Sequence, residues 1–211
     1  MRPISPAEEH KVLDPDHLQP GPEQCAAELD AVAAELAHQI RTADTAAEHA
    51  SAAGDHHGIS ARYESGATLT ALRMPTSAPL TFTPRELATI LTGVLQNAFD
   101  ASRAAAAAAF GGPEEDSELP QQGTYAEASR YGDITIALDA TGRVLWCTLT
   151  DTAGRWDAGR LTERILLLHN AAAMRANSIT PKFGTNVTAG IKEFFYTEEQ
   201  IAQYRLDNLT F

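Results

Sequence analysis

The chain has 211 residues, of which 44% are hydrophobic and 21% are charged, so it can form one large domain or two small ones around a real core. Its net charge of −12 repels nucleic-acid phosphates on average and counts against a nucleic-acid partner. Cys25 and Cys147 lie far apart, with neither metal-ligand spacing nor a disulfide framework. The N-terminus lacks the apolar run of a secretory signal, and no stretch is apolar enough to span a membrane. We therefore expect a reduced, cytoplasmic protein.

The first part of the chain predicts a disordered segment followed by a long helix. Residues 1–22 are rich in Pro, Glu, Asp and His and have no apolar period. From 23 to 51, a stripe that includes Leu29, Val32, Leu36 and Ile40 recurs at steps of three and four. Such a stripe is typical of a helix that packs against another helix. The partner is either a second helix of this chain or the same helix of a second copy.

Two short alternating runs and a helix complete a first unit, residues 23–110. The runs 59–63 and 69–74 predict a hairpin. Thr83 and Glu86 form a Thr-x-x-Glu capping box, Pro84 suits the first helical position, and Phe82 can pack on Leu87 as a hydrophobic staple. We expect the helix to continue through the alanines at 104–109 and to end near Gly111.

A second unit, residues 124–178, follows an acidic linker at 111–123. A short extra strand is expected at 124–129, and the alternating runs 134–138 and 143–149 predict a hairpin with a tight turn between them. The subsequent helix is predicted from the helical spacing of Leu161, Ile165, Leu168 and Ala172.

The two units match at a constant offset of 74 residues. Phe82 corresponds to Trp156 and Leu87 to Leu161, so in each unit an aromatic residue precedes a helix cap and a leucine follows five positions later. We interpret the match as an internal repeat of a ββα unit, although strand-turn-strand-helix is a common order and coincidence is the alternative.

The last segment, 179–211, predicts a tail with a short helix. An apolar cluster at 191–196 precedes Thr197 and Gln200, which form another capping box, and the helix is expected to reach about Asp207. We expect the tail to dock on the body of the protein. The alternative is an apolar tail held ready for a partner.

No constellation in the sequence carries catalytic chemistry, and we predict no enzyme activity, cofactor or metal site. His56 and His57 adjoin on a turn but lack a third fixed ligand. His169 is expected to be a partly exposed helical residue, because it follows the stripe position Leu168 and has no nucleophile partner. Cys147 alternates with Trp146 and is expected to be a small core residue.

Arginine is the one charge of interest. Five arginines gather in the second unit, and Arg160 and Arg164 are neighbours on the helix face away from Leu161. One interpretation is a solvated, ion-paired helix face. The other is a phosphate-contacting edge, which would consist of Arg143, Arg155, Arg160, Arg164 and Arg175.

The second unit resembles the YbaB/EbfC family of nucleoid-associated proteins. The resemblance rests on the strand 133–139, the run Gly142-Arg-Val-Leu-Trp-Cys-Thr-Leu, and a helix that begins near Leu161 with the pattern Leu-x-x-x-Ile-Leu. The chain is also similar to YbaB-like accessory proteins of type VII secretion, of the EspD type. The family implies a dimer built from a long N-terminal helix, a small antiparallel sheet and a second helix. It implies DNA binding of low sequence specificity and no catalysis. This chain differs in its two copies of the unit, its acidity and its long tail.

We therefore predict an α+β fold made of two tandem ββα units and a long N-terminal helix, with a small antiparallel sheet covered by helices. The first functional hypothesis is a non-enzymatic, nucleoid-associated DNA-binding protein. The second is a cytosolic protein-interaction or chaperone-like accessory protein of a type VII secretion system. It would act as a homodimer or with a protein partner, through the stripe Leu29, Val32, Leu36 and Ile40 or through the cluster at 191–196. The acidic charge favours the second hypothesis, and the family resemblance favours the first.

Overall fold

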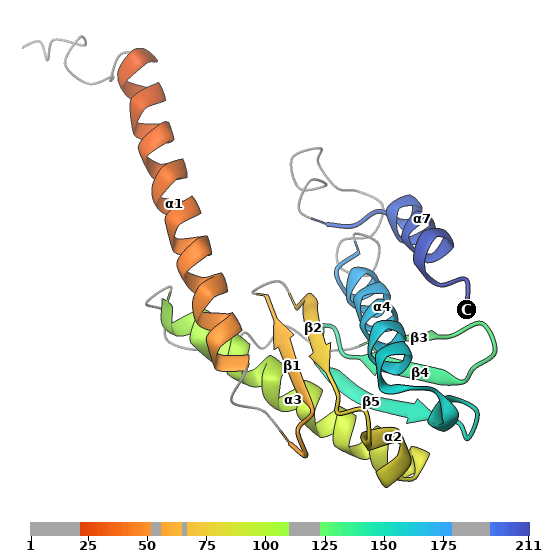
Figure 1. Cartoon of the computed structure of the whole chain (residues 1–211). Coiled ribbons are helices and arrows are strands. Elements are labelled where there is room, and N and C mark those ends of the chain that lie inside the picture. The colour runs from red at the N-terminus through yellow and green to blue at the C-terminus, as the bar shows by residue number, and fades with distance from the viewer. Residues whose placement is uncertain (1–21, 52–55, 65–66, 110–122, 179–194) are drawn as a thin grey trace, which may run out of the picture. The chain divides into compact units, whose positions relative to one another are not determined.

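A computed structural model describes residues 22–51, 56–64, 67–109, 123–178 and 195–211. The predicted disordered segment and most of the predicted linker and of the apolar cluster at 191–196 lie outside these ranges. Contacts divide the chain into two units, residues 1–38 and residues 39–211. The protein is α+β, with helices and two small antiparallel sheets (Figure 1).

The five main and minor α-helices of the described residues alternate with pairs and triplets of strands. The helices are α1 (Pro22–Ser51), α2 (Ala78–Thr81), α3 (Pro84–Ala109), α4 (Ala158–Ala176) and α7 (Glu198–Asn208), with a short 3₁₀ helix η3 at Ala153–Arg155. Helices α2 and η3 were not predicted from the sequence. Each is a single turn directly before a main helix, too short for a periodic apolar pattern to reveal it.

The strands form one two-stranded and one three-stranded sheet. The first sheet pairs β1 (Ser60–Tyr63) with β2 (Leu69–Arg73), and the second has the order β3 (Tyr125–Ala128), β4 (Ile134–Leu138) and β5 (Val144–Leu149). The predicted hairpins and the extra strand at 124–129 are confirmed. The β4–β5 ladder contains a bulge, because Ala137 pairs with Trp146 and Leu138 with Val144, which leaves Leu145 as the extra residue.

Helix α3 begins at the predicted capping box. The Thr83 N–H donates to Glu86 Oε2 at 2.8 Å, and the Glu86 N–H donates back to Thr83 Oγ1 at 3.3 Å. Hydrogen bonds from the Thr83 backbone and hydroxyl hold the pKa of Glu86 below its usual value. Helix α7 begins at the same kind of box, formed by Thr197 and Gln200. Helix α4 begins with Asp157, whose side chain accepts from the Arg160 N–H.

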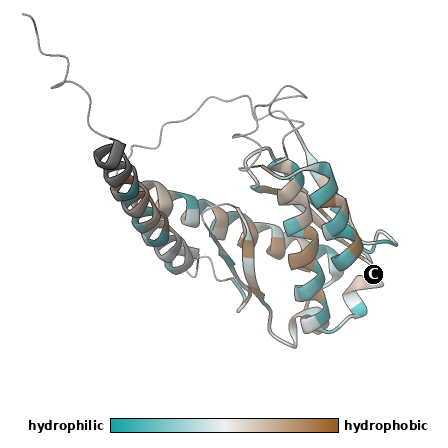
Figure 2. Cartoon of the chain, turned by 90° about the horizontal axis from the view of Figure 1, so that it is seen from above, coloured by the Kyte–Doolittle hydropathy of each residue, from teal (hydrophilic) through white to brown (hydrophobic). Residues whose placement is uncertain are grey.

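The two hairpin-and-helix segments share one hydrophobic core. Helix α3 packs on β5 and on β1, whereas α4 packs on β4, on β3 and on β2 (Figure 1). Hydrophobic residues of α3 and α4 lie on different sides of each helix from the hydrophilic ones (Figure 2). The predicted buried stripes of both helices are confirmed, and their buried members are Leu87, Leu91, Val94, Ala98, Leu161, Ile165, Leu168 and Ala172. Each helix therefore covers a strand of the other segment.

The turns of the two hairpins also meet. Gly142 has a φ of +90°, in the left-handed region that favours glycine. A Cβ added to Gly142 would lie 2.6 Å from the Cβ of Ala67, in the turn of the first hairpin. A similar approach joins the segments before the main helices, because a Cβ on Gly154 of η3 would lie 2.6 Å from Pro84 Cγ. Glycine is required at both places by close contact between the segments.

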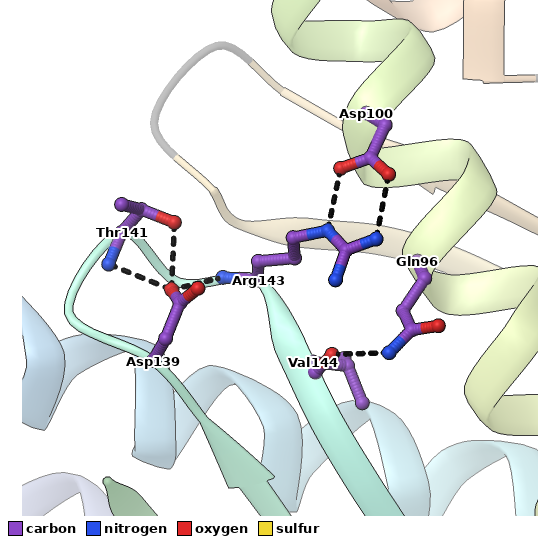
Figure 3. Close-up of polar contacts among 6 residues, drawn as sticks. All are labelled: Gln96, Asp100, Asp139, Thr141, Arg143 and Val144. Atoms are coloured by element: carbon purple, nitrogen blue, oxygen red, sulfur yellow. Dashed lines mark hydrogen bonds and ion pairs between the residues drawn. The ribbon is translucent and has the colours of Figure 1, made fainter. Parts of the chain in front are cut away.

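Two amide side chains fasten the segments to each other in a reciprocal way. Gln96 of α3 donates through Nε2 to the Val144 carbonyl of β5, at 2.8 Å (Figure 3). Asn170 of α4 binds Leu69 of β2 twice, since Nδ2 donates to the Leu69 carbonyl and Oδ1 accepts from the Leu69 N–H, both at 3.0 Å. Gln96 and Asn170 lie 74 residues apart, which is the offset of the repeat seen in the sequence. Each helix thus caps the edge of a strand in the other segment.

His169 corrects a prediction, because it is fully buried and not partly exposed. Its Nε2 lies 3.0 Å from the hydroxyl of Tyr63, which is also fully buried, and its Nδ1 lies 3.4 Å from Asn170 Oδ1. Helix α4 contacts β2 on one side and β3 and β4 on another, so its buried face is wider than the stripe counted from one sheet. Burial lowers the pKa of His169 to about 4, and the imidazole is therefore neutral at neutral pH.

Candidate interaction surfaces

An exposed apolar stripe runs along α1. Val32 is 65% exposed, Leu36 is 51% exposed and Ile40 is 43% exposed, although all three are large aliphatic residues. The backbone of Leu29 lies in the same helix, but its side chain is outside the described set. At the C-terminal end of the stripe, Ala43 is buried. The sequence predicted this stripe, and the described residues leave its middle part uncovered.

Two of the five predicted phosphate-contacting arginines are held in ion pairs within the chain. Arg143 makes a bidentate pair with Asp100 of α3, with Nε and Nη2 at 2.7 and 2.8 Å from the two carboxylate oxygens (Figure 3). The nearby Asp139 accepts from the backbone N–H groups of Thr141 and Arg143, which shapes the hairpin turn. The side chain of Arg143 therefore joins the second hairpin to helix α3.

The second pair surrounds a buried carboxylate. Glu127 of β3 is 2% exposed, and its oxygens lie 3.1 Å from Arg175 Nη1 and 3.4 Å from Arg205 Nη2. Arg175 Nη1 also donates to the Ala126 carbonyl at 3.2 Å. The two arginines come from α4 and α7, so the clamp attaches the last helix to the sheet. A charged residue inside an otherwise apolar strand was the one signal for this clamp in the sequence, but not for its partners.

Three of the predicted arginines lie close together in sequence around Trp156. The guanidinium carbon of Arg160 lies 4.6 Å from the Trp156 ring centroid, and that of Arg164 lies 4.3 Å from it. Arg164 is also 4.3 Å from the ring of Phe211, and burial together with Arg160 lowers its pKa. Arg155 is exposed. These stacked cations replace the ion-paired helix face that was one interpretation of the sequence.

The C-terminal tail docks on the body over its described length, 195–211. Ile201 is buried, the Tyr204 hydroxyl donates to the Leu167 carbonyl at 3.3 Å, and Leu209 and Phe211 pack against the core. The Arg130 N–H also donates to the carbonyl of Phe211, at 2.7 Å. This agrees with the expectation that the tail packs on its own chain.

A groove lies between α3 and β5, and sequence reasoning missed it. It encloses about 610 Å³, within the range of small-ligand and peptide sites. One wall is a face of α3, and the other is the end of β5 with the exposed ring of Trp146; the described lining residues are Arg85, Ala88, Thr89, Thr92, Gly93, Gln96, Trp146, Cys147, Thr148 and Leu149. No sequence motif marks such a groove, because it depends on how a helix crosses a strand edge.

The remaining candidates behave as ordinary structural residues. Cys147 is buried, as predicted, and burial raises the pKa of its thiol to about 12. His56 and His57 are exposed, with ring centroids 4.2 Å apart. Within the described ranges, no group of three or more His, Cys, Asp or Glu side chains is placed to hold a metal ion. None of the described helices has the length and apolar character that a membrane span requires.

Comparison of the chain with protein-family models, with curated proteins and with solved structures finds no match. The functional argument therefore rests on the surfaces described above.

Proposed function

We propose that this is a non-enzymatic protein-interaction protein, of the chaperone-like or accessory type, that binds a protein through α1. The observation that carries the proposal is the exposure of Val32, Leu36 and Ile40 along one face of the helix. Fully burying an aliphatic side chain of this size stabilises a complex by about 1.5–3 kcal/mol. Three such side chains in a row therefore provide a substantial driving force for association.

The helix itself needs such a partner. Isolated helices are marginal in water, and most helix stability in proteins comes from packing of an apolar face. The stripe repeats at a spacing close to that of coiled coils, so another helix is the surface that fits it best. The partner is a protein helix, either from a second copy of this chain or from a different protein.

The test compares two helix faces. Val32→Glu combined with Leu36→Glu places charges in the stripe, whereas Ala34→Glu adds a charge on the opposite face at an exposed position. Light scattering over a range of concentrations measures self-association. Affinity capture from the source cells, followed by binding measurements with the purified partner, measures hetero-association.

We expect the wild type and Ala34→Glu to associate and the stripe variant to lose association. Circular dichroism of each variant shows whether the fold of the body is retained. A monomeric wild type, together with capture that is equal for the stripe variant and for Ala34→Glu, would rule out α1 as the binding element.

A second candidate function is DNA binding of low sequence specificity, as the YbaB/EbfC resemblance implies. It is favoured by the cationic side chains of Arg155, Arg160 and Arg164 around Trp156. The ion pairs of Arg143 and Arg175, and the net charge of −12, count against it.

Anisotropy of a labelled duplex at low and moderate salt tests the DNA hypothesis. Binding should weaken as salt rises and be lost in Arg155→Glu with Arg160→Glu, but persist in the control Arg62→Glu, an exposed site on β1. Absence of binding at low salt would remove this candidate.

We also propose that residues 39–211 are an internal pseudo-dimer made of two repeated units. The reciprocal bonds of Gln96 and Asn170, 74 residues apart, are the main support, together with the contact between α2 and η3, which lie at the same offset. The extra strand β3 distinguishes the second unit. Such a repeat would let a single chain reproduce the dimer that the resemblance implies.

A further inference from the structure

We propose that the groove between α3 and β5 binds a short extended peptide carrying an acidic residue, which adds to the edge of β5 as a further strand. This site is separate from the α1 stripe and goes beyond the function proposed above. The argument rests on the backbone direction at the edge, on the open wall of α3 and on the charge of the lining.

The edge of β5 is only partly capped. The Cys147 N–H donates to Thr92 Oγ1 at 3.1 Å, so this residue directs its backbone groups away from β4. Thr150, three positions later, directs its N–H toward Asp133 of the β4 side, at 2.9 Å. Because backbone direction alternates along a strand, Leu149 also directs its N–H and carbonyl away from β4 and into the groove.

The other two edges near the helices are treated differently. Asn170 binds both backbone groups of Leu69 on β2, and Arg175 binds the Ala126 carbonyl on β3. Among the described residues, no side chain bonds to the backbone of Leu149. Strand β5 also has no charged or proline residue to discourage pairing from Val144 to Leu149. An extended peptide is the ligand that completes such an edge.

The wall of α3 leaves room beside the edge. Gly93 lies inside the helix, where glycine is unfavourable by about 1 kcal/mol relative to alanine. Yet a Cβ added there would meet nothing within 4 Å, so packing inside the chain does not require a glycine. Its absence of a side chain instead allows a ligand to approach the helix closely. Trp146, 41% exposed, provides an aromatic surface on the opposite wall.

The charge of the groove selects the peptide. Arg85 is the one charged side chain among the described lining residues, in a chain with 28 acidic residues. It has no ion-pair partner within the described part of the chain. Thr89 and Thr92 donate their hydroxyls to α3 carbonyls, which leaves their oxygens to accept hydrogen bonds. A single carboxylate that reaches Arg85 is therefore complementary, and a lysine at that place is not.

The experiment uses the full chain and a fluorescein-labelled pentapeptide, Thr-Val-Asp-Val-Thr. Binding is measured by anisotropy, and by Trp146 emission with the unlabelled peptide in a Trp156→Phe background, where Trp146 is the remaining tryptophan. Two matched peptides accompany it: one with Lys in place of Asp, and one N-methylated at the central residue, which cannot donate to a strand edge. We expect saturable binding of the first peptide and at least about ten-fold weaker binding of both controls.

Two protein variants locate the site. Gly93→Leu fills the open space and should weaken binding at least about ten-fold while the melting temperature is unchanged or higher. Gly93→Ala should bind nearly as well as the wild type. Arg85→Glu should reverse the preference between the Asp and Lys peptides. No saturable binding of any peptide at millimolar concentration, or binding that Gly93→Leu and N-methylation leave unchanged, would overturn the proposal.

Discussion

The buried His169 makes the stability of this protein depend on pH in a defined window. The imidazole is fully buried between the Tyr63 hydroxyl and Asn170, and burial lowers its pKa to about 4. In the unfolded chain the same side chain titrates near its ordinary value, about 6.5. Below pH 6.5 the unfolded state therefore binds more protons at this site than the folded state does.

The magnitude follows from the difference between the two pKa values. Each pH unit between the unfolded and folded pKa removes about 1.4 kcal/mol from the free energy of unfolding. A displacement from 6.5 to about 4 corresponds to a loss of about 3 kcal/mol at this one site as the pH falls through that window. The contribution is fully present above pH 6.5 and is gone below about 4. This is a large share of a typical folding stability of about 5–15 kcal/mol.

The assay compares the wild type with His169→Gln. Glutamine retains an acceptor for the Tyr63 hydroxyl but does not titrate, so the many carboxylates of the chain contribute equally to both proteins. Urea unfolding at a series of pH values from 7 to 4 gives the two stability curves. We expect the stability of the wild type relative to the variant to fall by about 3 kcal/mol over this range.

Two stability curves that run parallel would refute the reasoning. They would mean that the folded state takes up a proton at His169 as readily as the unfolded chain does. A relative stability that rises as the pH falls would refute it as well, because it would require a raised pKa in the folded state.

The remaining predictions concern contacts between the segments. Gly142→Ala should lower the free energy of unfolding by about 2 kcal/mol, because the added methyl group occupies a strained conformation at a close contact; thermal unfolding measures it. Asn170→Ala should lower it by about 1–3 kcal/mol, since it leaves a backbone donor and acceptor of β2 unpaired, and amide hydrogen exchange in β2 should rise; unchanged exchange would contradict this. Arg175→Ala with Arg205→Ala should destabilise the protein by about 3 kcal/mol through the unpaired carboxylate of Glu127, and Glu127→Gln in the same background should restore much of the loss in urea unfolding.

Local features of the fold were accessible from the sequence because they depend on neighbours in the chain. The capping boxes at Thr83 and at Thr197 involve residues three positions apart, and both form as predicted. The hairpins and the buried stripes of α3 and α4 follow from periodicity, which a chain segment carries whatever it packs against. The exposed stripe of α1 was visible for the same reason.

Features that depend on distant segments were not accessible in this way. Five arginines near one another in the sequence were read as a candidate edge, yet Arg143 pairs with Asp100 and Arg175 with Glu127, each more than 40 residues away. His169 was expected to be partly exposed because one stripe was counted, whereas α4 packs on strands of both sheets.

The sequence by itself determined which segments become helices and strands, because periodicity and capping are properties of a few consecutive residues. It also showed the 74-residue offset between the two segments. Only the tertiary structure decided that each helix covers a strand of the other segment, with Gln96 and Asn170 capping opposite edges. The same crossing left the end of β5 beside an open wall of α3. Pairing partners across a fold are selected by the packing of the whole core, and no short stretch of sequence contains that information.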